Sequence, residues 1–267
     1  MSARKLTFFY KFALKFLKQT LMKKLITIIL FSAIGIYSVK AQDENKIKSR
    51  YSGKEEKLML NFYTDLWQNV DSSMTVSAYS PGFDVYGMYN IPFGKSKFAF
   101  GFGLGFGTHN IRSNAMPANE FRHDSVLGNV ETGNTIFERI PDYVNNKEIK
   151  YDINKLTLTY FDIPLELRYK TKNKKDDAIK FAIGFKVGYL LSSHTKYKGN
   201  DLSGGDFDVK YKTYKIKNIE PLRYGATARF GYGIWNVFGY YSLSKIFKVD
   251  KGPEMYPISA GICITPF

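Results

Sequence analysis

One ten-residue stretch of this chain alternates strictly between large apolar side chains and very small ones. From Phe98 to Gly107 it reads Phe-Ala-Phe-Gly-Phe-Gly-Leu-Gly-Phe-Gly. A period of two residues is that of a β-strand, in which successive side chains point to opposite faces. One face of this strand is bulky and apolar, and the other carries almost no side chains. Such a strand suits a narrow barrel whose outer face meets lipid and whose lumen is lined by the small face.

The same alternation recurs along the chain, so the sequence predicts eight strands. Their expected ranges are Leu58 to Trp67, Phe83 to Ile91, Phe98 to His109, Leu156 to Tyr169, Ile179 to Leu191, Leu222 to Tyr232, Val237 to Ile246 and Tyr256 to Thr265. In the fourth of these, the phase slips by one residue between Tyr160 and Phe161, which we interpret as a β-bulge on that strand.

Connection lengths also alternate along the predicted strands. The turns after the second, fourth and sixth strands are short, whereas the other connections are mostly longer and polar. We therefore expect an all-β fold over residues 57–267, an eight-stranded antiparallel up-and-down transmembrane β-barrel with both termini on the periplasmic side. Residues 111–150 and 196–218 form its long surface loops.

The first 41 residues have the features of a secretory signal peptide. Met22-Lys23-Lys24 is a short basic region, an apolar run extends from Leu25 to Ile36, and Ala41 offers a small residue at the cleavage point. We expect this segment to be helical and to be removed, leaving residues 42–56 as a periplasmic N-terminal segment. Met22 offers a second start, and with it residues 1–21 become a spurious extension, so the choice between Met1 and Met22 stays open.

Removal of the signal changes the charge balance. The whole chain has 39 basic and 24 acidic residues, for a net charge of +15, and eight of the basic residues lie before residue 42. The remaining net charge is about +7, which argues against nucleic acid as a partner. Cys263 is the only cysteine, which excludes an intramolecular disulfide and a thiolate metal cluster. The sequence suggests no cofactor.

Charged residues recur on the predicted inner face of the barrel, and they are expensive to bury unless they are paired. They are Asp84, Asp162, Glu166, Arg168, Lys186, Arg223 and Arg229. Counting from the turn at residues 171–177 places Asp162 roughly opposite Lys186, close enough for a cross-strand ion pair. We therefore predict a luminal charge network of paired or solvated side chains. An ion or proton path is the less favoured alternative, since eight strands enclose a lumen that side chains fill.

Two other functions have some support in the sequence. His109 and His194 lie at the predicted outer ends of the third and fifth strands, and His123-Asp124-Ser125 lies in the large loop. These are ingredients for acyl transfer or hydrolysis at the rim, or for a metal site, but no Gly-x-Ser-x-Gly or His-Glu-x-x-His motif accompanies them. The other alternative is a soluble periplasmic barrel that turns its bulky face inward around an apolar ligand. We expect neither, and predict no enzyme.

Several of these features together resemble the PorT-type outer-membrane β-barrel family. They are the signal ending in Ala-Gln, the Phe-Gly alternation of residues 98–107, the strand Tyr-Phe-Asp-Ile-Pro-Leu-Glu-Leu-Arg-Tyr at residues 160–169, and the closing Ser-Ala-Gly-Ile at residues 259–262. The resemblance implies an integral outer-membrane barrel, and some members take part in secretion and gliding systems. From the barrel and its polar loops we expect a structural or interaction role. The implied partners are the lipid bilayer, the barrel-assembly machinery and a protein or glycan at the surface loops.

Overall fold

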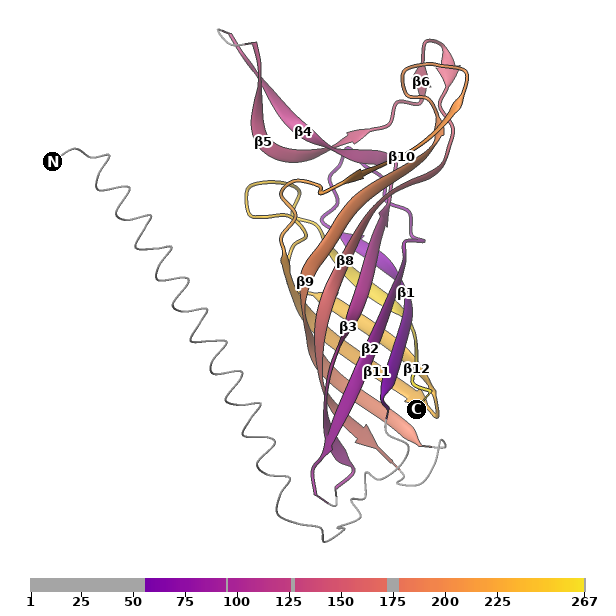
Figure 1. The fold of residues 1–267 in the computed structure, drawn as a ribbon, viewed down its shortest axis with the longest axis vertical. Coiled ribbons are helices and arrows are strands. Elements are labelled where there is room, and N and C mark those ends of the chain that lie inside the picture. Colours follow the sequence, from indigo (N-terminus) through magenta and orange to yellow (C-terminus); the bar gives the residue numbers. More distant parts are fainter. Residues whose placement is uncertain (1–55, 95, 126–127, 172–177, 267) are drawn as a thin grey trace, which may run out of the picture. The chain divides into compact units, whose positions relative to one another are not determined.

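The computed structural model describes residues 56–94, 96–125, 128–171 and 178–266. The expected signal peptide, and all but the last residue of the expected periplasmic segment, lie outside these residues. The described part is built of β-strands and turns (Figure 1). Within it, no helix is both long and apolar enough to cross a membrane.

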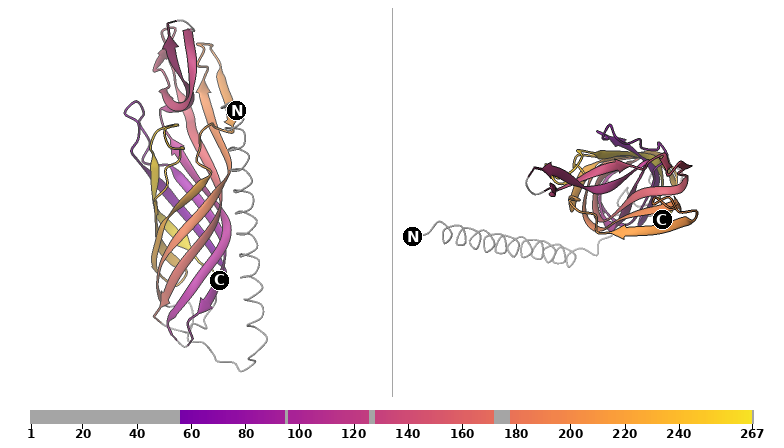
Figure 2. Two further views of the ribbon diagram at one scale, coloured as in Figure 1. Left: turned by 90° about the vertical axis from the view of Figure 1, so that its left-hand side faces the viewer. Right: turned by 90° about the horizontal axis from the view of Figure 1, so that it is seen from above.

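Eight strands pair in a closed antiparallel ring, which confirms the predicted barrel. In ring order they are β1 (Leu58–Gln68), β2 (Pro81–Pro92), β3 (Phe98–Arg112), β8 (Tyr151–Lys170), β9 (Ile179–Asn200), β11 (Leu222–Tyr232), β12 (Trp235–Ser242) and β13 (Tyr256–Ile264). β13 pairs with β1 and so closes the ring. The view along the barrel in Figure 2 shows the strands surrounding a common axis. Each of these strands overlaps one of the eight predicted ranges.

Five further strands lie at the end of the barrel opposite the C-terminus (Figure 1). β4 (Ala115–Asp124) and β5 (Gly128–Arg139) form one hairpin, β6 (Tyr143–Val144) and β7 (Lys147–Glu148) form another, and β10 (Asp208–Tyr214) pairs with the distal part of β9. We call these five strands and their loops the crown. β3, β8 and β9 extend toward it with 15, 20 and 22 residues, whereas β12 has only 8. In outer-membrane barrels the end with long loops faces the outside of the cell.

The large apolar side chains of the strands point away from the barrel axis. On β3, Leu104 is 55% exposed and Phe106 50% exposed, while the intervening Gly105 is buried. The same holds around the ring, and we call this outward surface the apolar belt. It includes Phe62, Phe83, Phe98, Phe102, Leu104, Phe106, Ile163, Leu167, Phe181, Ile183, Phe185, Leu222, Phe230, Val237 and Ile262. A soluble barrel with its bulky face inward is therefore the wrong alternative.

The predicted bulge is real, but its extra residue lies on the neighbouring strand. Thr159 of β8 pairs with Ser192 of β9, and Tyr160 pairs with Leu190, so Leu191 is the additional residue. From Ile153 to Lys170, β8 keeps one phase, with Leu156 and Leu158 as buried as Tyr160, and a second register shift lies nearer the crown, between Tyr151 and Ile153. The apparent slip on β8 arises because its inward side chains change from charged to apolar near the mouth of the barrel.

The seventh strand is also shorter than predicted. β12 ends at Ser242, and the chain then turns so that Ile246 and Phe247 are buried at the mouth. Their apolar character reflects burial in the loop that follows and not a continued strand facing lipid.

Candidate functional site in the barrel interior and the crown

The half of the lumen nearest the C-terminus holds a network centred on two carboxylates. The Glu166 carboxylate accepts hydrogen bonds from Arg168 Nε at 2.8 Å and from Arg229 Nη2 at 2.9 Å. Glu56, just before β1, lies 3.3 Å from Arg168 Nη1, 3.2 Å from Arg229 Nη2 and 2.9 Å from Lys180 Nζ. Both carboxylates are nearly fully buried. Each arginine therefore bridges the two acids, which is the arrangement that offsets the cost of burying charge.

A second network occupies the middle of the lumen. Lys186 Nζ lies 3.3 Å from Asp84 and 4.0 Å from Asp162. Arg223 contacts Asp162 through two nitrogens, with Nε donating at 3.1 Å and Nη2 at 2.5 Å. The Tyr86 hydroxyl donates a hydrogen bond to Asp162 at 2.8 Å. Two cations and two carboxylates thus balance each other.

Aromatic rings complete the surroundings of these charges. Tyr63 donates a hydrogen bond to Asp84 at 2.7 Å. The Lys186 ammonium lies 4.2 Å from the centre of the Tyr240 ring, and the Arg223 guanidinium lies 4.0 Å from that of Tyr160. Cations over ring faces gain a further electrostatic contribution where water is excluded. The middle of the lumen is therefore filled by a packed polar core.

His109 lies inside the barrel, and its predicted position on the rim is wrong. It is 2% exposed, and its Nδ1 lies 2.9 Å from Asp65, which also accepts a hydrogen bond from Ser259 at 2.6 Å. The Ser259 hydroxyl thus donates its hydrogen bond to the Asp65 carboxylate and not to the His109 imidazole. Within the described residues, His109 Nε2 has no hydrogen-bond partner. A nucleophile held by the imidazole, as acyl transfer by a triad requires, is missing from this arrangement.

The other two histidines lie outside the lumen, on β9 and β4. His194 is on the outward face of β9, where its ring lies 5.4 Å from that of Tyr214 and is tilted against it. His123 is exposed on β4 and contacts Asn129. Over the residues that the structure describes, no group of three or more metal-binding side chains comes together.

An apolar cluster closes the mouth of the barrel below the crown. It draws on several loops as well as on the strand ends, and comprises Trp67, Met74, Ile111, Ala115, Phe137, Leu156, Leu158, Tyr160, Ile219, Ile246, Phe247 and Met255. The rings of Phe137 and Phe247 pack edge to face at 6.0 Å. Because a dry apolar plug lies between the charged lumen and the crown, the interior has the form of a sealed cylinder and not of a channel.

Two of the four glycines of β3 lie directly against the luminal charges. A methyl group placed on Gly107 would lie 2.5 Å from Asp84, 2.6 Å from Arg223 and 2.6 Å from Asp162. One placed on Gly101 would lie 2.7 Å from Arg168 Nε. At these two positions the small face leaves room for charged side chains from other strands, whereas Gly103 and Gly105 lie against Met88 and Tyr86.

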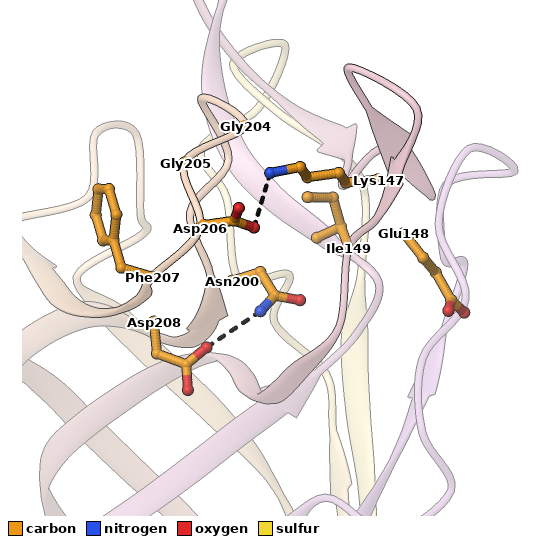
Figure 3. Close-up of a pocket in the computed structure, with 9 residues that line it drawn as sticks. All are labelled: Lys147, Glu148, Ile149, Asn200, Gly204, Gly205, Asp206, Phe207 and Asp208. Atoms are coloured by element: carbon orange, nitrogen blue, oxygen red, sulfur yellow. Dashed lines mark hydrogen bonds and ion pairs between the residues drawn. The ribbon is translucent and has the colours of Figure 1, made fainter.

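The crown contains an open polar pocket of about 390 Å³ (Figure 3). Lys147, Glu148 and Ile149 line one side, and the turn between β9 and β10 supplies the other with Asn200, Gly204, Gly205, Asp206, Phe207 and Asp208. Lys147 Nζ lies 2.7 Å from Asp206, and Asn200 donates to Asp208 at 3.1 Å. Phe207 is 61% exposed. The pocket thus presents hydrogen-bonding groups beside one uncovered aromatic ring.

A family model described as an outer membrane protein beta-barrel domain matches residues 41–248. This is well over half of the chain. The chain belongs to this family of outer-membrane β-barrels. Comparisons with curated proteins and with solved structures find no match.

For this outer-membrane barrel, the structure brings the seven sequence-predicted luminal residues into two groups. Glu166, Arg168 and Arg229 form the first, and Asp84, Asp162, Lys186 and Arg223 form the second. Sequence reasoning missed Glu56 and Asp65, along with Tyr63 and Tyr86. Glu56 precedes the first strand, where no alternation indicates its direction. Asp65 lies on a strand whose alternation is weak, although it is in phase with the buried Asn61 and Tyr63.

Proposed function

We propose that this protein is an interaction protein of the outer membrane, which contacts a protein or glycan partner through its crown. The observation that carries the proposal is the division of the molecule into a sealed barrel and an elaborated outer end. The lumen is filled by paired charges and capped by apolar side chains. The groups available to a partner outside the membrane are therefore those of the crown.

The chemistry of the crown supports a contact role. Phe121, Tyr143, Phe207 and Tyr214 are each at least 59% exposed on it. Exposed aromatic side chains are unusual on a surface that contacts only water, and they are enriched where proteins bind partners. The pocket beside Phe207 adds carboxylate, amide and ammonium groups to this surface. The PorT-type resemblance extends the proposal to a component of a secretion or envelope system.

Labelling in intact cells tests the topology on which this role depends. The only native thiol, Cys263, is buried, so an introduced cysteine can be followed with a membrane-impermeant maleimide. Phe207→Cys, in the crown, is expected to be labelled in whole cells. The matched control is Phe93→Cys, because Phe93 is 49% exposed in the turn between β2 and β3. The introduced cysteine is expected to react only after the cells are broken.

A cross-linker attached at Phe207→Cys then tests the interaction itself. We expect it to capture a discrete partner in intact cells, and a cross-linker on Val249→Cys, exposed in the β12–β13 loop, to capture less of it. Labelling of Phe93→Cys in whole cells with protection of Phe207→Cys would reverse the orientation. Absence of any cross-linked product at crown positions would contradict the interaction role.

A further inference from the structure

Four cations lie side by side in one row across four strands, above the apolar belt. Arg112 of β3 pairs in register with Lys155 of β8, and Lys155 pairs with Lys196 of β9. Lys196 in turn pairs with Lys212 of β10. Neighbouring strands are about 4.8 Å apart, so the row spans about 15 Å. We call these four residues the cation row.

The cation row belongs to the outward face of the sheet. Ile111, Leu156 and Thr195 are the sequence neighbours of Arg112, Lys155 and Lys196, and all three are buried on the opposite face. Since side chains alternate along a strand, the four cations point away from the barrel axis. Lys212 is exposed, and the other three are partly exposed.

Carboxylates of the described residues leave the row without a counter-charge. Among the residues that the structure describes, none of the four cations forms an ion pair, and the nearby Asp152 is engaged by Lys198. Lys155 donates to the amide oxygen of Asn110 at 2.9 Å, and Arg112 lies 5.5 Å from the centre of the Tyr79 ring. Like charges directly opposite each other across strands oppose folding. The row is thus an unbalanced positive strip.

The charges of the row act on one another and on the adjacent histidine. Burial, followed by the charges of Arg112, Lys196 and Lys212, lowers the pKa of Lys155, which lies above the apolar belt. Burial, followed by Lys212, Lys155 and Lys196, also lowers the pKa of His194. The contributions of the neighbouring cations to both pKa shifts have the sign expected of a positive potential, which a bound anion would relieve.

The height of the row above the lipid indicates the kind of anion. The highest outward row of apolar side chains shared by β3, β8 and β9 is Phe106, Phe161 and Tyr189, and Leu191 of β9, 55% exposed, lies two residues higher. Arg112 is six residues beyond Phe106, or about 20 Å along the strand and about 15 Å along the membrane normal at a tilt of about 40°. Lysine side chains can reach several ångströms back toward the membrane. The row therefore lies at the level of large headgroups and above the acyl chains.

We propose that the cation row binds the phosphate groups of outer-leaflet glycolipid headgroups. Several cations in line fit a headgroup that carries more than one phosphate, and the uncovered rings of Tyr79 and Tyr214 beside the row fit its sugars. The site would hold anionic glycolipids against the outward faces of β3, β8, β9 and β10. This lipid contact is separate from the polar pocket beside Phe207.

Lipid titration of the purified full-length chain tests the proposal. The probe is bis-phosphorylated lipid A, followed by native mass spectrometry in neutral detergent. The triple variant Lys155→Gln, Lys196→Gln, Lys212→Gln is expected to bind it about 100-fold more weakly at low salt, since each lysine near an anionic lipid surface contributes about fivefold. The Lys→Arg triple variant keeps the charges and is expected to bind within about threefold of the unaltered protein.

A matched variant controls for net charge. Lys245→Gln, Lys248→Gln, Lys251→Gln removes three exposed lysines from the β12–β13 loop and is expected to leave lipid A binding unchanged. Heat-modified migration on gels reports that each variant still forms the barrel. Equal binding of lipid A by both Gln triples would overturn the proposal. So would equal affinity for dephosphorylated lipid A, or displacement of lipid A by free pyrophosphate or an RNA oligomer at equal phosphate concentration.

Discussion

At the scale of single residues, the interior depends on complete pairing of buried charges. Lys186 and Arg223 meet Asp84 and Asp162 in a space that is closed to solvent, and each carboxylate also accepts a tyrosine hydrogen bond. A buried pair contributes little compared with an apolar substitute of the same shape. Loss of one partner is different, because it leaves the other charge buried alone. The network should therefore respond much more to single substitutions than to paired ones.

Lys186→Met tests this directly. The substitution removes the cation that lies 3.3 Å from Asp84, and we expect the free energy of unfolding to fall by about 3–5 kcal/mol. The double variant Asp84→Asn, Lys186→Met should lose less than the sum of the two single losses, by about 1 kcal/mol or more. Urea titration in detergent, read by heat-modified migration, measures both.

Lys198→Met is the matched control for that experiment. Its ion pair with Asp152 is exposed where β8 and β9 reach the crown, so its loss should cost less than about 1 kcal/mol. If Lys186→Met were as stable as the unaltered protein, the luminal network would carry no stabilising role.

At the scale of the element, β3 shows how the opening sequence pattern and the interior are related. Its outward Phe and Leu side chains belong to the apolar belt, and its glycines leave room for Asp84, Asp162, Arg168 and Arg223. The strand is therefore small on its inner face because side chains of other strands occupy the lumen. A barrel this narrow cannot hold large side chains from every strand at the same height.

Gly107→Ala should disturb this packing. The added methyl group would overlap three members of the middle network, and we expect it to lower the free energy of unfolding by about 1–3 kcal/mol, as overpacking of a core does. Gly239→Ala is the matched control, because a methyl group there meets nothing within 4 Å. Equal urea midpoints for the two variants would show that β3 has spare room in the lumen.

The same scale shows what the sequence could and could not predict. The lipid-facing strands were predictable because strict alternation continues wherever one face meets lipid and the other meets charges. The prediction of a bulge on β8 went wrong where Leu156 and Leu158 face the apolar plug, since an apolar side chain looks the same in sequence whether it meets lipid or a dry mouth. The hairpins of the crown lack a buried face of their own at most positions, so their residues carry little periodic signal.

The luminal charges were predictable for the same reason as the strands. Asp162, Glu166 and Arg168 interrupt an apolar alternation on one phase of β8, and only the lumen offers charges a place there. Their pairing partners were harder to predict because contacts across the lumen depend on strand tilt and register. Glu56 joins Arg168 and Arg229 from outside any strand, a position that no pattern in the sequence indicates.

At the scale of the whole molecule, three zones follow one another along the barrel axis. A charged lumen is enclosed by the apolar belt, an apolar plug closes its mouth, and the crown extends beyond. The cation row lies above the belt and runs from β3 to β10 of the crown. This order assigns lipid contact to the strands and partner contact to the hairpins, and everything in it depends on the apolar rows facing the bilayer.

Quenching of tryptophan fluorescence by brominated lipid tests that orientation most directly. The chain has two tryptophans, Trp67 and Trp235, so a variant with Trp67→Phe, Trp235→Phe and Leu104→Trp reports from the middle of the apolar belt alone. A variant with only Trp235→Phe reports from Trp67, which is 8% exposed inside the barrel. We predict strong quenching of the tryptophan at position 104 and little quenching of Trp67. Strong quenching of Trp67 with protection of position 104 would contradict the account.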